Sequence, residues 1–109
     1  MSSEVYAVKI SVGNDTDTAT TSDEHFGAVV SVFADNNING NRTLSSITDS
    51  HGLNILGNAT LAAISSSTGT AQYEQTEMGG TAVAGTITVT TTDSAGSSGT
   101  LDVYVYIAP

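Results

Sequence analysis

Regular alternation of apolar and polar residues at both ends of the chain constrains its fold more than any other feature of the sequence. The apolar positions are Tyr6, Val8, Ile10 and Val12 near the N-terminus and Leu101, Val103, Val105 and Ile107 near the C-terminus. A repeat of two residues places such side chains on one face of an extended strand. Both ends are therefore predicted to form β-strands that bury an aliphatic face, with Lys9 and Tyr104 among the residues facing the other way.

The segments between these ends carry the same β signal. Thr, Val and Ile, which favour a pleated sheet surface, make up about a third of the 109 residues. Residues 26–33 are apolar on both faces, with Val30 and Val32 on the same face, which predicts a strand that either lies centrally or has one face at an interface. Residues 81–92 alternate aliphatic residues with threonines, which predicts one long strand.

Turn signals predict how these strands are joined. The Asn39-Gly40 pair tolerates positive φ at both positions and is the strongest hairpin signal in the chain, so a returning strand is predicted at 42–47. A second hairpin is predicted to join 81–92 to the last strand. Short strands are expected at 61–64 and 72–77, and an acidic loop at 13–24.

About seven to eight short strands joined by frequent turns predict an all-β fold, either an antiparallel β-sandwich or a jelly roll. Residues 1–109 are expected to form a single β domain with a short N-terminal arm at 1–4. Ile, Leu, Val and Phe make up only about 22 % of the chain, close to the roughly 20 % at which a chain of high net charge is expected to be disordered. Because such a core is thin, association with neighbours is expected to add stability.

The charge of the chain excludes several classes of function. Lys and Arg number 2 against 11 Asp and Glu, the formal net charge is -9, and there is no cysteine. Lys9 and Arg42 alone cannot neutralise a nucleic-acid backbone or hold the chain on an anionic membrane. The N-terminus has neither the basic nor the long apolar stretch of a secretory signal, so export is not expected.

One segment has the residue spacing of a calcium loop. Asp35, Asn37 and Asn39, followed by Gly40, offer oxygen ligands at alternate positions before a glycine turn. The twelfth position of that loop is Ser46, so the bidentate carboxylate of a calcium loop is missing. A hairpin turn explains the same residues more simply, and the chain is predicted to hold no metal and no cofactor.

The acidic loop offers a second candidate metal site. Its carboxylates lie close together in the sequence and are followed by a histidine: Asp15, Asp17, Asp23, Glu24 and His25. Clustered carboxylates bind calcium or magnesium. The simpler alternative is a solvated loop.

The sequence contains no catalytic motif and is predicted not to encode an enzyme. It has no G-x-S-x-G elbow, no glycine-rich phosphate loop and no H-E-x-x-H. The last strand instead presents Tyr104 and Tyr106 opposite its aliphatic face. Together with Phe33 they are candidates for an interface, because tyrosine brings a large contact area at low entropic cost. The alternative is that the opposing sheet covers the two tyrosines.

The general build of the chain and its closing segment carry a family resemblance. A cysteine-free β chain rich in Ala, Gly and Thr, ending in GTLDVYVYIAP at 99–109, resembles the small head decoration (cement) proteins of tailed bacteriophages. The resemblance implies a protein made in the host cytoplasm that binds the outside of an assembled capsid. Its partners would be the major capsid protein and copies of itself, in dimers or trimers that bridge neighbouring capsid subunits.

Two other functions are compatible with the sequence. The first is an extracellular filament or pilus-like subunit that donates a strand to its neighbour, which would explain the Thr, Ser and Gly content and the N-terminal arm. The second is a small carbohydrate-binding or receptor-binding β module, for which Tyr104 and Tyr106 are the only support in a chain without tryptophan.

Overall fold

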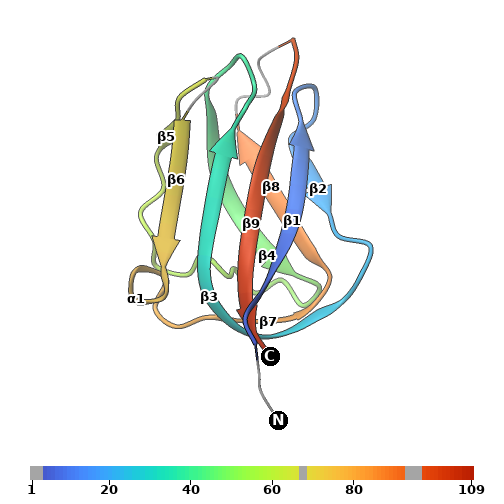
Figure 1. Cartoon of the computed structure of the whole chain (residues 1–109), viewed down its shortest axis with the longest axis vertical. Coiled ribbons are helices and arrows are strands. Elements are labelled where there is room, and N and C mark those ends of the chain that lie inside the picture. The colour runs from blue at the N-terminus through green and yellow to red at the C-terminus, as the bar shows by residue number, and fades with distance from the viewer. Residues whose placement is uncertain (1–3, 67–68, 93–96) are drawn as a thin grey trace.

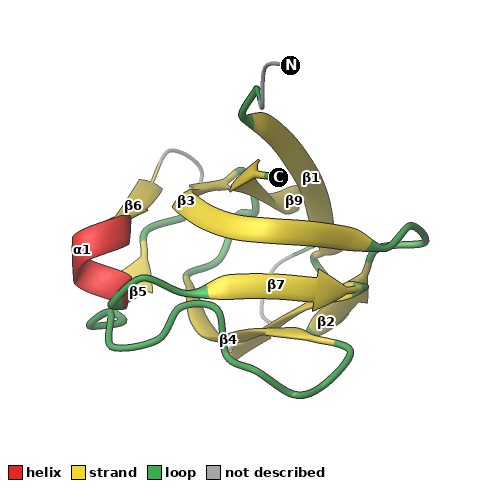
Figure 2. Cartoon of the chain, turned by 90° about the horizontal axis from the view of Figure 1, so that it is seen from below, coloured by secondary structure: helices red, strands yellow, loops and turns green. Residues whose placement is uncertain are grey.

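The computed structural model describes residues 4–66, 69–92 and 97–109, which form two antiparallel sheets packed face to face (Figures 1 and 2). The five-stranded sheet has the order β1 (Tyr6–Gly13), β9 (Thr100–Ala108), β3 (His25–Asn36) and β6 (Gly69–Glu74), with β7 (Ala82–Gly85) also paired to β3. The four-stranded sheet has the order β2 (Thr18–Thr20), β8 (Ile87–Thr92), β4 (Arg42–Asp49) and β5 (Ala63–Ile64). One short helix, α1 (Gln75–Met78), follows β6. All but the last residue of the predicted N-terminal arm lies outside the described residues.

The strand pairing is that of a chain folded in half and then rolled up. From the middle of the chain outward, β4 pairs with β5, β3 with β6, β2 with β8 and β1 with β9. The roll closes because β9 also pairs with β3 and β8 also pairs with β4. A double sheet wound in this way is a jelly roll. The predicted all-β sandwich or jelly roll is confirmed, with nine strands in the part of the chain that the structure describes.

The aliphatic faces of the two sheets meet in one core. The alternating residues predicted to be buried supply much of it: Val8, Ile10, Val12, Leu101, Val103, Val105 and Ile107. Tyr6, predicted on the same face, is 37 % exposed at the first position of β1. Each buried aliphatic side chain contributes about 1.5–3 kcal/mol relative to an exposed one, so these two strands hold the five-stranded sheet against its partner. No helix among the described segments is long and apolar enough to cross a membrane.

The Asn39-Gly40 pair does not form the predicted hairpin. The preceding strand β3 lies in the five-stranded sheet, whereas β4, which covers the predicted strand at 42–47, lies in the four-stranded sheet. Residues 37–41 are therefore a corner that carries the chain from one sheet to the other. The hairpin prediction is wrong because long-range contacts at this corner override the local turn preference.

A buried amide holds this corner together. The side chain of Asn36 has no exposed surface. Its Nδ2 donates to the carbonyl oxygens of Gly40, Ile64 and Ser65 at 2.9–3.1 Å, and its Oδ1 accepts the N–H of Ile38 at 3.0 Å. Ile38 is fully buried as well, so the hydrogen bonds of Asn36 and the packing of Ile38 both stabilise the corner.

The predicted long strand at 81–92 is also divided between the sheets. β7 pairs with β3 in one sheet and β8 pairs with β2 and β4 in the other, with Thr86 between them. Gly85 has a φ of +107°, which L side chains rarely adopt, and this permits the chain to change direction there. The predicted hairpin of 81–92 with the last strand is therefore wrong, since β8 and β9 lie in different sheets.

A β-bulge changes which side chains of β3 face the core. The register with β9 shifts between Val29 and Ser31, so Val29 and Val32 are both fully buried while Val30 is only half-buried. Val30 and Val32 do not share a face as predicted, because the extra residue reverses the alternation. The central position of β3 is confirmed by its pairing with β6, β7 and β9.

Three shorter segments also differ from prediction. The predicted strand at 72–77 ends at Glu74, where a capping box with Glu77 starts α1 instead. Within the predicted acidic loop at 13–24, the three residues of β2 pair with β8, next to a hydrogen bond from the Thr91 N–H to the Asp17 carbonyl oxygen at 2.8 Å. The strand expected at 61–64 is confirmed only for its last two residues.

Candidate interaction surface

The outer surface of the five-stranded sheet brings together aromatic side chains from separate strands. The register places Lys9, Tyr104, Phe33 and Gln72 in one row across β1, β9, β3 and β6. Tyr106 lies in the next row along β9. The three predicted interface residues, Phe33, Tyr104 and Tyr106, therefore share one face, and it is the outer one because the aliphatic residues of β9 occupy the inner one.

The opposing sheet does not cover these tyrosines. The Phe33 and Tyr104 rings pack with centroids 6.2 Å apart and planes at 40°, and the Lys9 Nζ lies 5.9 Å from the Tyr104 centroid. Tilted aromatic pairs and cations over a ring each add about 0.5–1.5 kcal/mol beyond area burial. Tyr104 is thus held by neighbours on its own face while it remains partly exposed.

Small apolar residues extend this surface toward the chain termini. Ala28 pairs with Ala108 on one side and Ala82 on the other, and Phe26 pairs with Ala84. Phe26 is 58 % exposed, the most exposed large apolar side chain described. Its exposure could not be read from the sequence, because both faces of the segment are apolar.

We call the outer surface of β3 and β9 formed by Phe26, Ala28, Phe33, Tyr104 and Tyr106 the aromatic face. Between its first and last rows, neither strand places a charged side chain on that surface. On a chain of net charge -9, such a neutral aromatic area is distinctive. Exposed apolar areas of this kind mark sites of association with other molecules.

Two carboxylates lie immediately beyond the aromatic face. Asp35 of β3 is the register partner of Asp102 of β9. Asp102 accepts hydrogen bonds from the Ser11 and Thr100 hydroxyls at 2.8 and 2.9 Å and from the Asn37 amide at 3.4 Å. Among the described residues, no side chain donates a hydrogen bond to Asp35. Like charges directly opposite on a sheet are destabilising, so repulsion between Asp35 and Asp102 is expected in the free protein.

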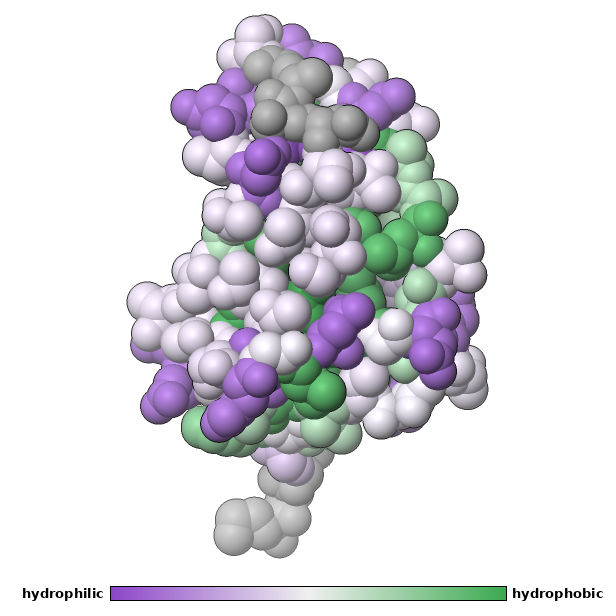
Figure 3. Space-filling view, turned by 180° about the vertical axis from the view of Figure 1, so that it is seen from behind, coloured by the Kyte–Doolittle hydropathy of each residue, from purple (hydrophilic) through white to green (hydrophobic). Residues whose placement is uncertain are grey.

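The outer surface of the four-stranded sheet has a different chemistry. It presents hydroxyl rows, in which Thr20, Thr88 and Thr48 are neighbours across β2, β8 and β4. The Thr20 and Thr88 hydroxyls bond each other at 2.8 Å. In Figure 3, side chains of intermediate hydropathy cover much of this side of the molecule. The described residues of this surface offer many hydroxyl groups but no aromatic side chain.

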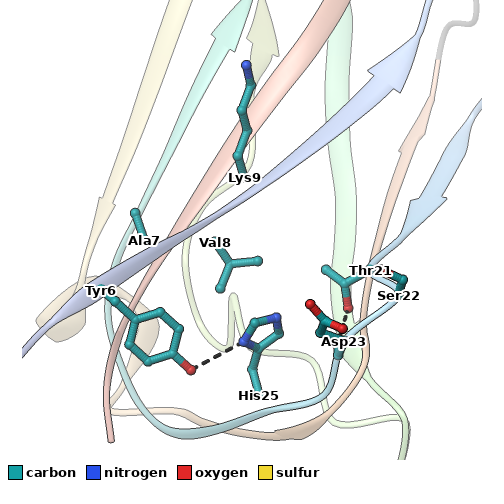
Figure 4. A pocket seen from close by; sticks show the side chains of 8 residues that line it. All are labelled: Tyr6, Ala7, Val8, Lys9, Thr21, Ser22, Asp23 and His25. Atoms are coloured by element: carbon teal, nitrogen blue, oxygen red, sulfur yellow. Dashed lines mark hydrogen bonds between the residues drawn. The ribbon is translucent and has the colours of Figure 1, made fainter.

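A small cleft opens between β1 and the segment that joins β2 to β3 (Figure 4). Its volume is about 290 Å³, and it is lined by Tyr6, Thr21, Ser22, Asp23 and His25, among others. The Tyr6 hydroxyl lies 3.3 Å from His25 Nδ1. The Lys9 side chain, although its residue borders the cleft, points away from it.

The structure separates the residues of each candidate metal site from one another. Asn39 is turned toward Ser97: its Nδ2 donates to the Ser97 hydroxyl and its Oδ1 accepts the Ser97 N–H, at 2.8 and 2.7 Å. Asp35 and Asn37 lie near Asp102 instead. In the acidic loop, β2 separates Asp15 and Asp17 from the cleft residues Asp23 and His25, with Glu24 between these two. No group of three His, Asp or Glu side chains in the described ranges is placed to hold a metal ion.

A fully buried cation, Arg42, was not singled out by the sequence. Nη1 donates to the Thr16 carbonyl at 2.9 Å and the Thr91 hydroxyl at 3.2 Å, and Nη2 donates to the carbonyls of Asn14 at 2.6 Å and Gly13 at 3.3 Å. Nε is buried without a hydrogen-bond partner. The guanidinium thus ties the loop before β2 to the four-stranded sheet.

A second buried polar group, Asp49, holds the far end of β4. Its carboxylate accepts the N–H groups of His51, Leu53 and Ala84 at 2.9–3.2 Å. Burial acts to raise the pKa of Asp49, but these three backbone donors and the nearby His51 outweigh it, so the pKa of Asp49 lies below its ordinary range. The ionised carboxylate therefore stabilises the turn at 49–53.

Comparisons with protein-family models, curated proteins and solved structures gave no match for this chain.

Proposed function

We propose that this chain is a non-enzymatic structural protein of a virion, which binds the outside of an assembled capsid and bridges neighbouring capsid subunits. The observation that carries the proposal is the aromatic face, a neutral surface on an otherwise acidic protein. Protein interfaces are enriched in Tyr and Phe and depleted in Lys, Asp and Glu at their centres.

The packing of the aromatic face supports its use as a docking surface. Tyr104 is already held between Phe33 and Lys9, so little side-chain freedom remains to be lost on binding. Phe26 provides a second, more exposed anchor on the same surface. Many copies on one capsid would add their shallow contacts through multivalency, each copy linking capsid subunits.

The strand topology favours this proposal over the filament alternative. Strand donation needs a sheet with an open position for the donated strand. In the described part of the chain, β9 occupies the position between β1 and β3, and the roll is closed by the chain's own strands. A donated strand could then add only at an outer edge.

The cleft supports a second candidate, a carbohydrate-binding module. Tyr6 offers an aromatic surface, and Asp23, His25 and Ser22 offer polar groups that bond sugar hydroxyls. An NMR titration with neutral mono- and disaccharides tests it. Saturable shifts at Tyr6 that disappear in His25→Ala but persist in His51→Ala would support sugar binding, and unchanged spectra would reject it.

The capsid proposal is tested by sedimenting the purified chain with capsids of its source virus that lack it. We expect saturable binding and capsids that resist a higher temperature. Tyr104→Ala should weaken binding about 30-fold, the effect of a loss of about 2 kcal/mol. Thr90→Ala, a truncation on the outer surface of the other sheet, should bind as the wild type does. Absence of binding, or equal losses in the two variants, contradicts the proposal.

A further inference from the structure

We infer that the partner surface seated on the aromatic face carries an arginine that inserts between Asp35 and Asp102, beside an apolar patch that contacts Phe33 and Tyr104. The inference rests on the proposed function, because it names the chemistry of the partner for that same face. Its basis is the pairing of two carboxylates in register at the edge of a neutral aromatic surface.

Among the residues that the structure describes, no cation forms an ion pair with either of these two carboxylates. The ammonium of Lys9, one row away, lies over the Tyr104 ring, and no ion pair joins Lys9 to either aspartate in the described ranges. Arg42 is wholly buried and bonded to the loop before β2. The negative charge at the end of the aromatic face is therefore available to a partner.

The two aspartates are not equivalent. Asp102 accepts three hydrogen bonds from neighbouring side chains, whereas Asp35 accepts none from the described residues. Asp102 is thus oriented by its surroundings, and Asp35 retains its capacity to accept. The oriented carboxylate of Asp102 and the carboxylate of Asp35 together suit a donor group whose N–H bonds are held in one plane.

Arginine fits this position better than lysine does. The guanidinium presents several N–H donors in one plane and bonds carboxylates at two points, whereas an ammonium acts as a point charge. The guanidinium also stacks on aromatic rings, and Phe33 and Tyr104 occupy the adjacent row. One arginine would then bond two carboxylates and contact the aromatic face together.

A second copy of this chain is a poor occupant of the face. It brings another net charge of -9 and only two Lys and Arg residues. Of these, Arg42 is buried and Lys9 is engaged by Tyr104. Face-to-face association of two copies would therefore bring four aspartates together without an available arginine. Charge complementarity thus selects a different protein.

The inference predicts that stability and binding change in opposite directions. Asp35→Asn removes the repulsion between register partners and loses no hydrogen bond from a described residue, so the melting temperature should rise by about 1–5 °C. The same variant should bind capsids about 10- to 100-fold more weakly, because a charge-assisted hydrogen bond is lost. A purely structural role for Asp35 would not separate the two readouts in this way.

The experiment compares Asp35→Asn with Asp17→Asn in the capsid sedimentation assay at several salt concentrations. Asp17 lies in an exposed loop before β2, so its replacement changes the net charge equally but away from the face. We expect weaker, less salt-dependent binding for Asp35→Asn alone. If both variants bind like the wild type while Tyr104→Ala does not, the arginine inference is wrong and the proposed function stands.

A second arm needs no capsid. The wild type and both variants are eluted from an arginine-bearing matrix with a salt gradient. If the inference holds, Asp35→Asn elutes at lower salt than Asp17→Asn although their net charges are equal. Identical elution shows that only the overall charge is sensed, and this overturns the inference. Failure of the wild type to bind capsids, with the elution difference intact, counts against the proposed function and leaves the arginine preference of the face in place.

Discussion

Replacement of Arg42 by methionine removes the charged group and keeps a flexible side chain that matches the aliphatic part of arginine. The guanidinium donates four hydrogen bonds, three of them to backbone carbonyl oxygens between Gly13 and Thr16. A methionine leaves these acceptors unsatisfied unless the loop opens to water. We therefore expect Arg42→Met to destabilise the protein and to loosen β2, whose only partner among the described strands is β8.

The expected magnitude follows from two opposing effects. Hydrogen bonds to a charged group contribute about 1.5–3 kcal/mol each, so four would give about 6–12 kcal/mol. Removal of the guanidinium from water costs several kcal/mol and offsets part of this. Because the loop at 14–17 is largely exposed and can rehydrate, we expect the lower end of the range for breaking a buried charged network, about 3 kcal/mol. For a chain of this size the melting temperature falls by about 12–24 °C.

The assay is urea unfolding followed by tyrosine fluorescence and circular dichroism, since the chain has four tyrosines and no tryptophan. Hydrogen exchange of the β2 amides reports the local effect. Arg42→Lys serves as the matched control: it keeps the charge but not the planar fork, and should recover only part of the loss. If Arg42→Met unfolds within about 0.5 kcal/mol of the wild type and β2 exchange is unchanged, apolar packing replaces the guanidinium and the reasoning is refuted.

Other substitutions test the buried polar side chains, the glycine turns and the candidate calcium loop. Asp49→Asn should cost about 1–3 kcal/mol at pH 7. Folding lowers the pKa of Asp49, so the extra stability of the wild type over Asp49→Asn is complete at pH values above the ordinary pKa of about 3.8. This extra stability is lost as the pH falls below that value. Urea midpoints of the two proteins that stay apart in acid would contradict this expectation. Asn36→Leu should cost about 1–3 kcal/mol by leaving buried carbonyls unpaired, and an unchanged midpoint would mean that the corner holds without it. Gly57→Ala should destabilise more than Gly52→Ala in thermal melts, since both have positive φ but only at Gly57 would a new Cβ lie 1.9 Å from a backbone oxygen; equal losses would contradict this. Millimolar calcium should leave the melting temperature unchanged in the wild type and in Asp35→Asn, and a rise confined to the wild type would restore the calcium-loop hypothesis.

Part of the candidate surface could be predicted from the sequence. The alternation in the last strand places Tyr104 and Tyr106 opposite the aliphatic residues, and this local property is independent of what packs around it. The opposition of Asp35 and Asp102 could not be predicted in this way. It depends on the register between strands that are distant in the sequence, and the bulge at Val30 shifts that register.

The sequence by itself determined the two terminal strands and their aliphatic faces, because a repeat of two residues acts within each strand. Only the tertiary structure decided to which sheet each strand belongs. The turn at Asn39-Gly40 favours a hairpin locally, but the buried contacts of Asn36 and Ile38 stabilise a corner between sheets instead. Arg42 likewise looks like an ordinary surface cation in the sequence. Its burial depends on carbonyl oxygens that a distant loop supplies, and such acceptors are assembled only when the chain rolls up.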